Sequence, residues 1–435
     1  MMRNQQSTVF ELDGIPCFKD VFPLAVQHVV AMIVGCVTPA LIIASTVRLS
    51  QPDSILLVQG SLVIAAVSTL MQLFPPFSWL GSGLPVILGV SFAYLPSMQA
   101  IAEGYDLATI FGAELMGGCV AVIVGIFVKK LRILFPPLIT GTVVFTIGLS
   151  LYPTAINYMA GGVGSPLYGD WRNWLVSIVT LVVVTVFNHN GKGIWKLASI
   201  LIGIMVGYLL ALPFGLVNFS AVGKAGLFSF PQLFHFGITF EISSCFALGI
   251  LFAINAVQAI GDFTATTVGA MNRQPSDKEL RSGIICYGVA NMLGACFGGL
   301  PTATYSQNVG IVTTTKVINR FTLGMSAFIL LLAGFVPKFS ALLTTIPQCV
   351  LGGATVTVFA SIAMTGMKLV VSQPMNYRNT SIVGLAAALG MGISQSSSAV
   401  ALFPDWFKII FAKSPVVIAT LVAVTLQVLL PGKDT

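Results

Sequence analysis

Two stretches of the chain open with the same three residues: Gly83-Leu84-Pro85-Val86-Ile87-Leu88-Gly89-Val90-Ser91-Phe92 and Gly299-Leu300-Pro301-Thr302-Ala303-Thr304-Tyr305-Ser306-Gln307-Asn308. Each stretch lies in a short segment that is rich in Gly and Pro and polar near its centre. A second pair of similar segments follows, because residues 346–352 resemble residues 135–141. Pro85 and Pro301 are 216 positions apart, and Pro137 and Pro347 are 210 apart. Two independent proline kinks would not explain such similar offsets, so the pattern predicts one internal duplication.

The composition places this duplication in a membrane. Of the 435 residues, 56% are hydrophobic and only 8% are charged, whereas a soluble domain has roughly 25% charged residues. Apolar runs of about 17–25 residues, long enough to cross a bilayer, recur along the chain. No cleavable signal precedes the first run, so we expect that run to stay in the mature protein.

The charges and cysteines argue against other classes of partner. The net charge of +7 is interpreted as a sign of membrane orientation rather than of nucleic-acid binding. The seven cysteines are scattered without metal-ligand spacing or a disulfide framework, so we expect no metal site. No nucleophile–base pair is evident either, and an enzyme is the least favoured class.

The apolar runs predict fourteen transmembrane segments. Fourteen segments with both termini in the cytoplasm place most of the 21 Lys and Arg residues on the cytoplasmic side, as the positive-inside rule requires. Seven spans per half is an odd number, so the two halves must be inverted relative to one another, and the two short segments are interpreted as interrupted spans that meet at the midplane. The predicted spans are 22–45, 54–74, 84–101, 107–128, 133–156, 172–187, 195–215, 243–271, 280–297, 300–315, 320–340, 347–371, 379–396 and 414–431.

Several of these motifs are similar to those of a known family. The chain resembles the nucleobase–ascorbate transporters, the second group of nucleobase–cation symporters, and most of all their bacterial xanthine and uric acid permeases. The resemblance extends along nearly the whole chain, and its most specific part is Ser306-Gln307-Asn308-Val309-Gly310. The other matching phrases are Gln27-His28 followed by Ala31-Met32, Gly83-Leu84-Pro85 leading into Ser91-Phe92-Ala93, and Met159-Ala160-Gly161-Gly162.

The resemblance implies an all-α, polytopic fold of two inverted seven-span repeats in a bacterial inner membrane. Residues 22–131 and 243–340 would form a core domain, and residues 132–215 and 346–431 a gate domain. It also implies a homodimer that imports a nucleobase by an elevator-like alternating-access motion. An oxidised purine such as xanthine or urate is expected, because the signature begins with Gln307, where uracil-type members usually have Glu.

The polar residues inside the predicted spans are the candidate site, because such residues are costly in a membrane. Carboxamides offer both a donor and acceptors to the edge of a purine ring, so Gln258, Gln307 and Asn308 are expected to bind it. Phe92 or Tyr94 would supply a stacking face. Extended backbone around Ala93 and Ser306 would add donors and acceptors, which is tolerable only where it lines a cavity. The alternative is that these amides only hold helices together.

Two positions depart from the family pattern. Gln258 stands where the family has a Glu that is credited with substrate binding and proton coupling, and Tyr287 stands where many purine members have an acid. Gln258 cannot titrate, so coupling to H⁺ or Na⁺ would fall to Asp262, one helical turn away. His28 is expected either to hold the 243–271 span by a hydrogen bond or to carry a proton.

Four readings therefore stay open at the level of sequence. The first is a cation-coupled purine importer, and the second is an uncoupled nucleobase facilitator. The third is an anion transporter on the same fold, against which the amide pair Gln307-Asn308 argues. The fourth is a transport-inactive membrane sensor descended from a permease.

Overall fold

The fold was analysed in a computed structural model that describes residues 8–131, 136–404, 407–408 and 414–430. In this part of the chain the protein is mostly helical, with one small sheet of two strands, β1 (Leu88–Val90) and β2 (Thr302–Thr304). The helices of the first half are α1 (Phe18–Thr46), α2 (Gln51–Leu73), η1 (Phe92–Tyr94), α3 (Leu95–Gly104), α4 (Leu107–Ile126), α5 (Val128–Leu131), α6 (Pro137–Ser150), α7 (Tyr152–Met159), α8 (Trp171–Asn190), α9 (Ile194–Leu197), α10 (Ser199–Ala211) and α11 (Ser220–Lys224). The helices of the second half are α12 (Ile242–Met271), α13 (Asp277–Cys296), α14 (Ser306–Thr315), α15 (Arg320–Gly334), α16 (Pro337–Thr344), α17 (Gln348–Val371), α18 (Tyr377–Gln395), η3 (Ser397–Val400) and α20 (Pro415–Leu429).

Long apolar helices confirm a protein with several membrane spans. Seven segments of the described chain are long and apolar enough to cross a bilayer, namely α1, α2, α4, α6 with α7, α8, α12 and α17. The pair α15 and α16, bent by 82°, would make an eighth. Every predicted span contains a described helix, but the total of fourteen membrane crossings stays a prediction. The beginning of the predicted span 133–156 and the last residue of 414–431 lie outside the described residues.

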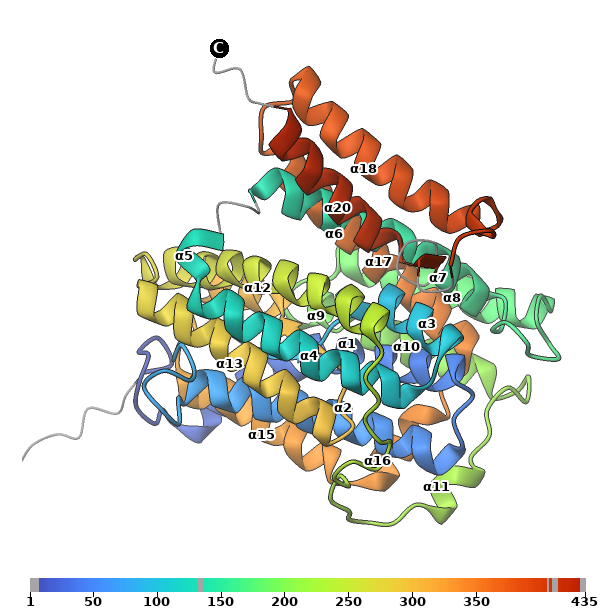
Figure 1. Ribbon diagram of the computed structural model, residues 1–435. Helices are drawn as coiled ribbons and strands as arrows, with labels where there is room; N and C mark the ends of the chain where they lie inside the picture. The colour runs from blue at the N-terminus through green and yellow to red at the C-terminus, as the bar shows by residue number, and fades with distance from the viewer. Residues whose placement is uncertain (1–7, 132–135, 405–406, 409–413, 431–435) are drawn as a thin grey trace, which may run out of the picture.

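The helices pack as two bundles. The larger bundle contains α1–α4 and α12–α16, in which α4 packs on α12 and α13, and α2 packs on α1, α13 and α15. The smaller bundle contains α6–α8, α10, α17, α18 and α20, in which α17 packs on α6, α7 and α8. Figure 1 shows α6, α18 and α20 above the layer that contains α4 and α12. The bundles meet where α1 contacts α9 and α10, and where α12 contacts α6 and α20.

The contacts between helices occur in matching pairs. If each helix is replaced by its counterpart from the other half of the chain, one contact of a pair becomes the other. In the larger bundle α1 packs on α15, and α12 packs on α4 in the same way. In the smaller bundle α8 packs on α10 and α17, and α18 packs on α20 and α6. A duplicated chain whose halves fold alike and intertwine would produce this correspondence.

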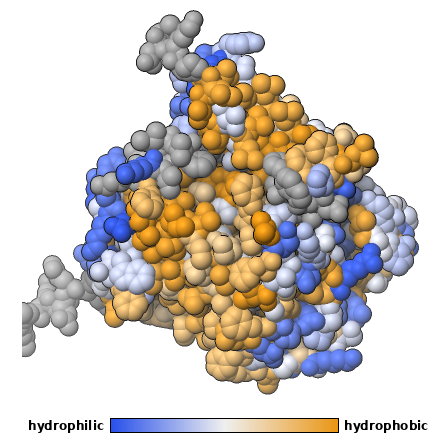
Figure 2. Space-filling view, in the orientation of Figure 1, coloured by the Kyte–Doolittle hydropathy of each residue, from blue (hydrophilic) through white to orange (hydrophobic). Residues whose placement is uncertain are grey.

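The surface between the polar ends of the helices is apolar. Figure 2 shows a broad hydrophobic area on the face that carries α4, α12 and α13, with hydrophilic areas at its margins. Large apolar side chains are exposed there, including Ile123 and Ile126 on α4 and Leu293 on α13. On α8, Ile178 and Val182 are exposed as well. Apolar surface of this extent needs a nonaqueous neighbour, which the acyl chains of a bilayer supply.

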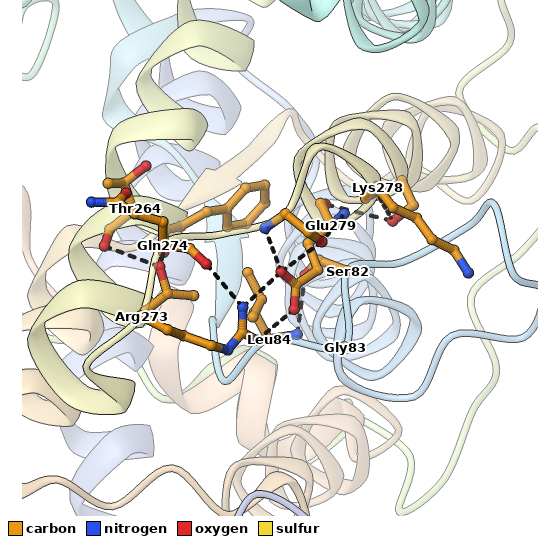
Figure 3. Close-up of polar contacts among 12 residues, drawn as sticks. Ser82, Gly83, Leu84, Thr264, Arg273, Gln274, Lys278 and Glu279 are labelled. Atoms are coloured by element: carbon orange, nitrogen blue, oxygen red, sulfur yellow. Dashed lines mark hydrogen bonds and ion pairs between the residues drawn. The ribbon is translucent and has the colours of Figure 1, made fainter.

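Polar contacts fix the turn between α12 and α13 next to the segment that leads into β1. Glu279 accepts two hydrogen bonds from the Arg273 guanidinium, at 2.9 and 2.6 Å, and one from the Ser276 backbone N–H at 2.7 Å. Figure 3 shows Ser82, Gly83 and Leu84 beside this group. The Gly81 N–H donates to the Ser282 carbonyl at 3.0 Å. The chain therefore enters β1 from a position that is attached to α13.

Glycines let the helices of the larger bundle approach closely. A Cβ atom added to Gly288 on α13 would lie 2.6 Å from the carbonyl oxygen of Gly118 on α4. A Cβ atom on Gly249 of α12 would meet only Val120, at the ordinary contact distance of 3.5 Å. Close backbone approach at small residues is a main source of helix association in membranes.

We predict that Gly288→Ala destabilises the protein by about 1–3 kcal/mol, because the added methyl group must push α4 and α13 apart. The matched control is Gly249→Ala, a buried helical glycine of the same bundle with space for a methyl group. Thermal unfolding of both variants in detergent measures the difference. Equal midpoints for the two variants would contradict the close α4–α13 packing.

Candidate binding cavity

The two strands form an antiparallel ribbon in the larger bundle. Leu88 pairs with Thr304, Gly89 with Ala303 and Val90 with Thr302, and all six residues are buried. Strands β1 and β2 belong to the two segments that open with the repeated Gly-Leu-Pro phrase. Short extended segments are therefore present and pair with each other, but they end before Ala93 and Ser306, where extended backbone was expected. Ala93 lies in the helical turn η1 (Phe92–Tyr94) and Ser306 is the first residue of α14, because a helix begins directly after each strand.

Two side chains satisfy the outer edges of this ribbon. On the β1 side, Thr69 of α2 donates its hydroxyl to the Leu88 carbonyl at 2.8 Å and accepts from the Leu88 N–H at 3.0 Å. On the β2 side, Asn291 of α13 accepts from the Thr302 N–H at 2.6 Å and donates to the Thr302 carbonyl at 3.4 Å. Each polar side chain thus replaces a neighbouring strand, as buried backbone groups require.

A helix begins immediately after each strand. α14 begins at Ser306, and the N–H of Val309 is the first to donate back into this helix, to the Tyr305 carbonyl at 3.0 Å. The preceding N–H groups are the orphan donors of a helix start. After β1 the short helix η1 begins at Phe92 and continues into α3. At η1 the donors are partly capped, because Ser91 accepts from the Ala93 N–H with its hydroxyl at 3.2 Å and from the Tyr94 N–H with its carbonyl at 3.4 Å. The positive end and the orphan donors of α14 therefore favour a polar or anionic ligand.

Both helix starts line one cavity, which lies between the two bundles. It measures about 160 Å³, well above the roughly 10–15 Å³ that one water needs by this measure, so it has room for a small molecule. Its lining from the larger bundle is Val30, Ala31, Val34, Gly35, Val90, Ser91, Phe92, Ala93, Gln258, Thr304, Tyr305, Ser306 and Gln307. Its lining from the remaining helices is Val144, Ile147, Leu197, Ile200, Val358, Ser361, Ile362 and Thr365. A mostly apolar wall with few polar groups is typical of small-molecule sites.

The structure brings together five of the six residues predicted to bind substrate. Gln258, Gln307, Phe92, Ala93 and Ser306 all line the cavity. Within the described chain, neither the Gln258 nor the Gln307 amide makes a hydrogen bond to protein, so both are free for a ligand. The Phe92 ring meets Phe359 of the smaller bundle edge to face, with the ring centroids 5.3 Å apart.

The sixth residue, Asn308, lies behind the cavity wall. Its Nδ2 donates to the His28 ring Nδ1 at 3.0 Å and to the His28 backbone carbonyl at 3.3 Å, and both residues are buried. One of the two roles expected for His28 from the sequence was to hold the 243–271 span, and the other was to carry a proton. The hydrogen bond instead joins α1 to α14, because Asn308 in the first turn of α14 faces α1. His28 therefore positions the helix start that carries Gln307.

Asp262 also acts on the strand–helix junction. Its carboxyl oxygens accept hydrogen bonds from the Ser306 hydroxyl at 2.8 Å and from the Thr304 hydroxyl. Two hydroxyl donors match the acceptor-only chemistry of an ionised carboxylate. Asp262 is buried and does not line the cavity, although Gln258 on the same face of α12 does.

Tyr287 lies deeper in the larger bundle. Its hydroxyl forms a hydrogen bond with the Tyr94 hydroxyl, and both side chains are fully buried beside Phe252. The Tyr94 and Phe252 ring centroids are 4.8 Å apart. Tyr287 therefore does not reach the cavity in this structure, but Tyr94 connects it to the segment that contains Phe92.

Sequence reasoning missed one buried acid, Glu114 of α4. Its side chain is fully buried, and neither carboxyl oxygen has a hydrogen-bond partner among the described residues. Its position inside the predicted span 107–128 was a readable signal, because an acid within a span is a functional candidate by default. The roles of Thr69 and Asn291 were missed too, since hydroxyl and amide side chains are common in spans.

We predict that Thr69→Val destabilises the protein by about 1–3 kcal/mol for each Leu88 backbone group that it leaves unpaired. The matched control is Thr142→Val, because the buried Thr142 hydroxyl only donates to the Leu138 carbonyl of its own helix, at 2.7 Å. Thermal unfolding in detergent tests the pair. A Thr69→Val variant as stable as the control would mean that Thr69 does not secure β1.

Comparisons with known proteins agree on the class of molecule. A model described as the permease family matches residues 19–398. The uric acid permease PucJ of Bacillus subtilis is 34% identical over 95% of this chain and 93% of its own length. The xanthine permease XanQ of Escherichia coli is 29% identical over 98% of this chain and 94% of its own. A putative purine permease of Clostridium perfringens is 32% identical over 94% of this chain and 90% of its own.

Solved structures resemble the fold at low sequence identity. The transmembrane domain of the cyanobacterial bicarbonate transporter BicA matches with a TM-score of 0.58 and 13% identity, over 95% of this chain and 98% of its own. The anion transporter Slc26a9 of the mouse, in its inward-facing state, matches with a TM-score of 0.62 and 10% identity, over 95% of this chain and 69% of its own. The chain therefore has a transporter fold of this type.

Proposed function

The chain belongs to the nucleobase–ascorbate permease family and is a transporter rather than an enzyme, and from this premise we propose that it imports an oxidised purine, xanthine or urate. The observation that supports this best is the pair of unpaired amides, Gln258 and Gln307, on the wall of one cavity. Each amide presents an NH₂ donor and a carbonyl acceptor. The keto groups and ring N–H groups of an oxidised purine are their complement.

The rest of the wall fits a flat ring. Phe92 offers an aromatic face at the start of the helical turn that also carries Ala93. The orphan N–H groups at the start of α14 lie on the same wall as the Gln307 side chain. Helix starts favour negative charge, so urate, which is an anion at neutral pH, suits this position. Asn308 would act by holding the helix start to His28, rather than by touching the purine.

We also propose how the molecule moves. The larger bundle would be the core domain (22–131 and 243–340), and the smaller bundle the gate domain (132–215 and 346–431), within fourteen spans in two inverted repeats with both termini in the cytoplasm. The paired helix contacts and the strand–helix arrangement of the 84–101 and 300–315 segments support the repeats. The cavity between the bundles suits an elevator-like motion of the core against the gate. A homodimer in the bacterial inner membrane would hold the gate still, and a proton or sodium gradient would drive uptake.

Three alternatives remain from the sequence. An uncoupled facilitator would use the same cavity without a gradient. A same-fold anion transporter is disfavoured by the two free amides, because an inorganic anion needs donors and not amide acceptors. A transport-inactive sensor would bind a purine without moving it. Uptake by reconstituted protein separates all three from the proposed function.

We predict that xanthine or urate raises the unfolding temperature of the purified protein, because a ligand that binds only the folded state stabilises it. Gln307→Ala should weaken the binding roughly ten- to a hundredfold, the equivalent of about 1–3 kcal/mol for an unpaired polar edge. Isothermal titration measures this affinity.

The matched control for this loss is Gln274→Ala, which removes an exposed amide in the turn between α12 and α13. Uracil should not stabilise the wild-type protein. Binding of uracil without either purine would contradict the proposed substrate, and wild-type affinity in Gln307→Ala would reduce Gln307 to a role in helix packing.

A further inference from the structure

Glu114 is a buried acid whose carboxyl group forms no hydrogen bond with any residue in the described part of the chain. It lies on α4, which packs on α3, α12 and α13 inside the larger bundle. The side chain has no exposed surface, and both carboxyl oxygens lack hydrogen-bond partners among the described residues. It is enclosed by α13 and α2, since a Cβ atom on Gly294 would lie 3.3 Å from Glu114 Oε1 and 2.8 Å from Ile64.

Among the described residues, no Lys, Arg or His donates a hydrogen bond to this carboxyl group. The titratable groups that interact electrostatically with it are Tyr94 on η1 and Tyr287 and Cys296 on α13. α12 contributes Asp262 and Cys245 as its titratable side chains, and α3 contributes Glu103. The basic residues of α13, Lys278 and Arg281, are more than three turns from Gly294, about 20 Å along the helix.

A purely structural role does not account for an acid in this place. An ionised carboxylate without donors is strongly disfavoured in an apolar interior, so the group is held as a neutral, protonated acid. The neutral acid still has a donor and acceptors without partners. An apolar side chain of similar volume would pack the same space without that penalty. What Glu114 offers and an apolar residue does not is an exchangeable proton.

Glu114 lies behind the substrate cavity in the bundle that carries it. The Tyr94 hydroxyl, in hydrogen-bonded contact with Tyr287, belongs to the helical turn Phe92–Tyr94, whose first residue lines the cavity. Asp262 is already engaged with two hydroxyls, and Gln258 cannot titrate. Of the buried acids described on the larger bundle, Glu114 is thus the one whose carboxyl group is unengaged.

We infer that Glu114 is the proton-binding group that couples purine uptake to a proton gradient, an inference that rests on the proposed function. The carboxyl group holds its proton while the larger bundle carries the purine inward. On the cytoplasmic side the motion of the bundle must let water reach the carboxyl group, so that its O–H bond breaks, the proton passes to water, and a hydrated carboxylate remains. Reprotonation from the outer side restores the neutral acid, and the hydrogen-bonded hydroxyls of Tyr94 and Tyr287 belong to the same buried region.

The first test is uptake of radiolabelled xanthine into proteoliposomes with an inward proton gradient. Wild-type protein should accumulate xanthine above its external concentration, whereas Glu114→Gln should only equilibrate it, while binding xanthine within about twofold of wild type. Glu114→Asp, which keeps an acid, should restore accumulation with a shifted pH profile. Asp20→Asn, which neutralises an exposed acid on α1, is the control and should behave as wild type. Full accumulation by Glu114→Gln would overturn the inference while leaving the proposed function intact.

The second test needs no purine. Infrared spectra of the wild-type protein at neutral pH should contain the carbonyl stretch of a protonated carboxylic acid, which shifts in D₂O and is missing from Glu114→Gln. Absence of this band from the wild-type protein would overturn the inference. If Glu114→Gln does not fold, Glu114→Asp should show the same class of band at a displaced frequency, and its absence there would count equally against a protonated acid. Failure of the wild-type protein to bind xanthine or urate would instead overturn the proposed function, and the coupling role with it.

Discussion

The pairing of β1 with β2 is the interaction on which the rest of the structure depends. A bilayer offers no water to unpaired backbone groups, so extended chain at membrane depth survives only when protein satisfies both of its edges. The two strands pair along their inner edges, and on the outer edges Thr69 pairs the backbone of Leu88 and Asn291 that of Thr302. A ribbon closed in this way allows two helices to begin inside the larger bundle rather than at its ends.

The polar side chains around the ribbon divide into those that hold the scaffold and those left for a ligand. Asn308 is engaged with His28, and Asp262 with Ser306 and Thr304. The Gln258 and Gln307 amides reach the cavity unpaired. Because the engaged groups fix where α14 begins, they decide which way Gln307 points. Specificity for a purine edge would then follow from the scaffold rather than from the amides alone.

The sequence was sufficient for those features that repeat or that follow from composition. The echo of Gly83-Leu84-Pro85 at Gly299 predicted two related segments, and both contain a strand followed by a helix. Side-chain direction could not be predicted, because a shift of one residue around a helix start turns Asn308 toward α1 and Gln307 toward the cavity. The bend between α15 and α16 and the isolation of Glu114 depend on neighbours that are distant in the sequence. Burial without a partner is visible only when those neighbours are in place.

The proposed purine site depends on two helix starts that the paired strands bring together between the bundles. A structure of the protein in lipid nanodiscs with bound xanthine or urate would show whether the purine lies there. We expect ligand density between Phe92–Ala93 and Ser306–Gln307, with the Gln258 and Gln307 amides on the edge of the ring. Density elsewhere, or a ligand that contacts neither amide, would contradict it.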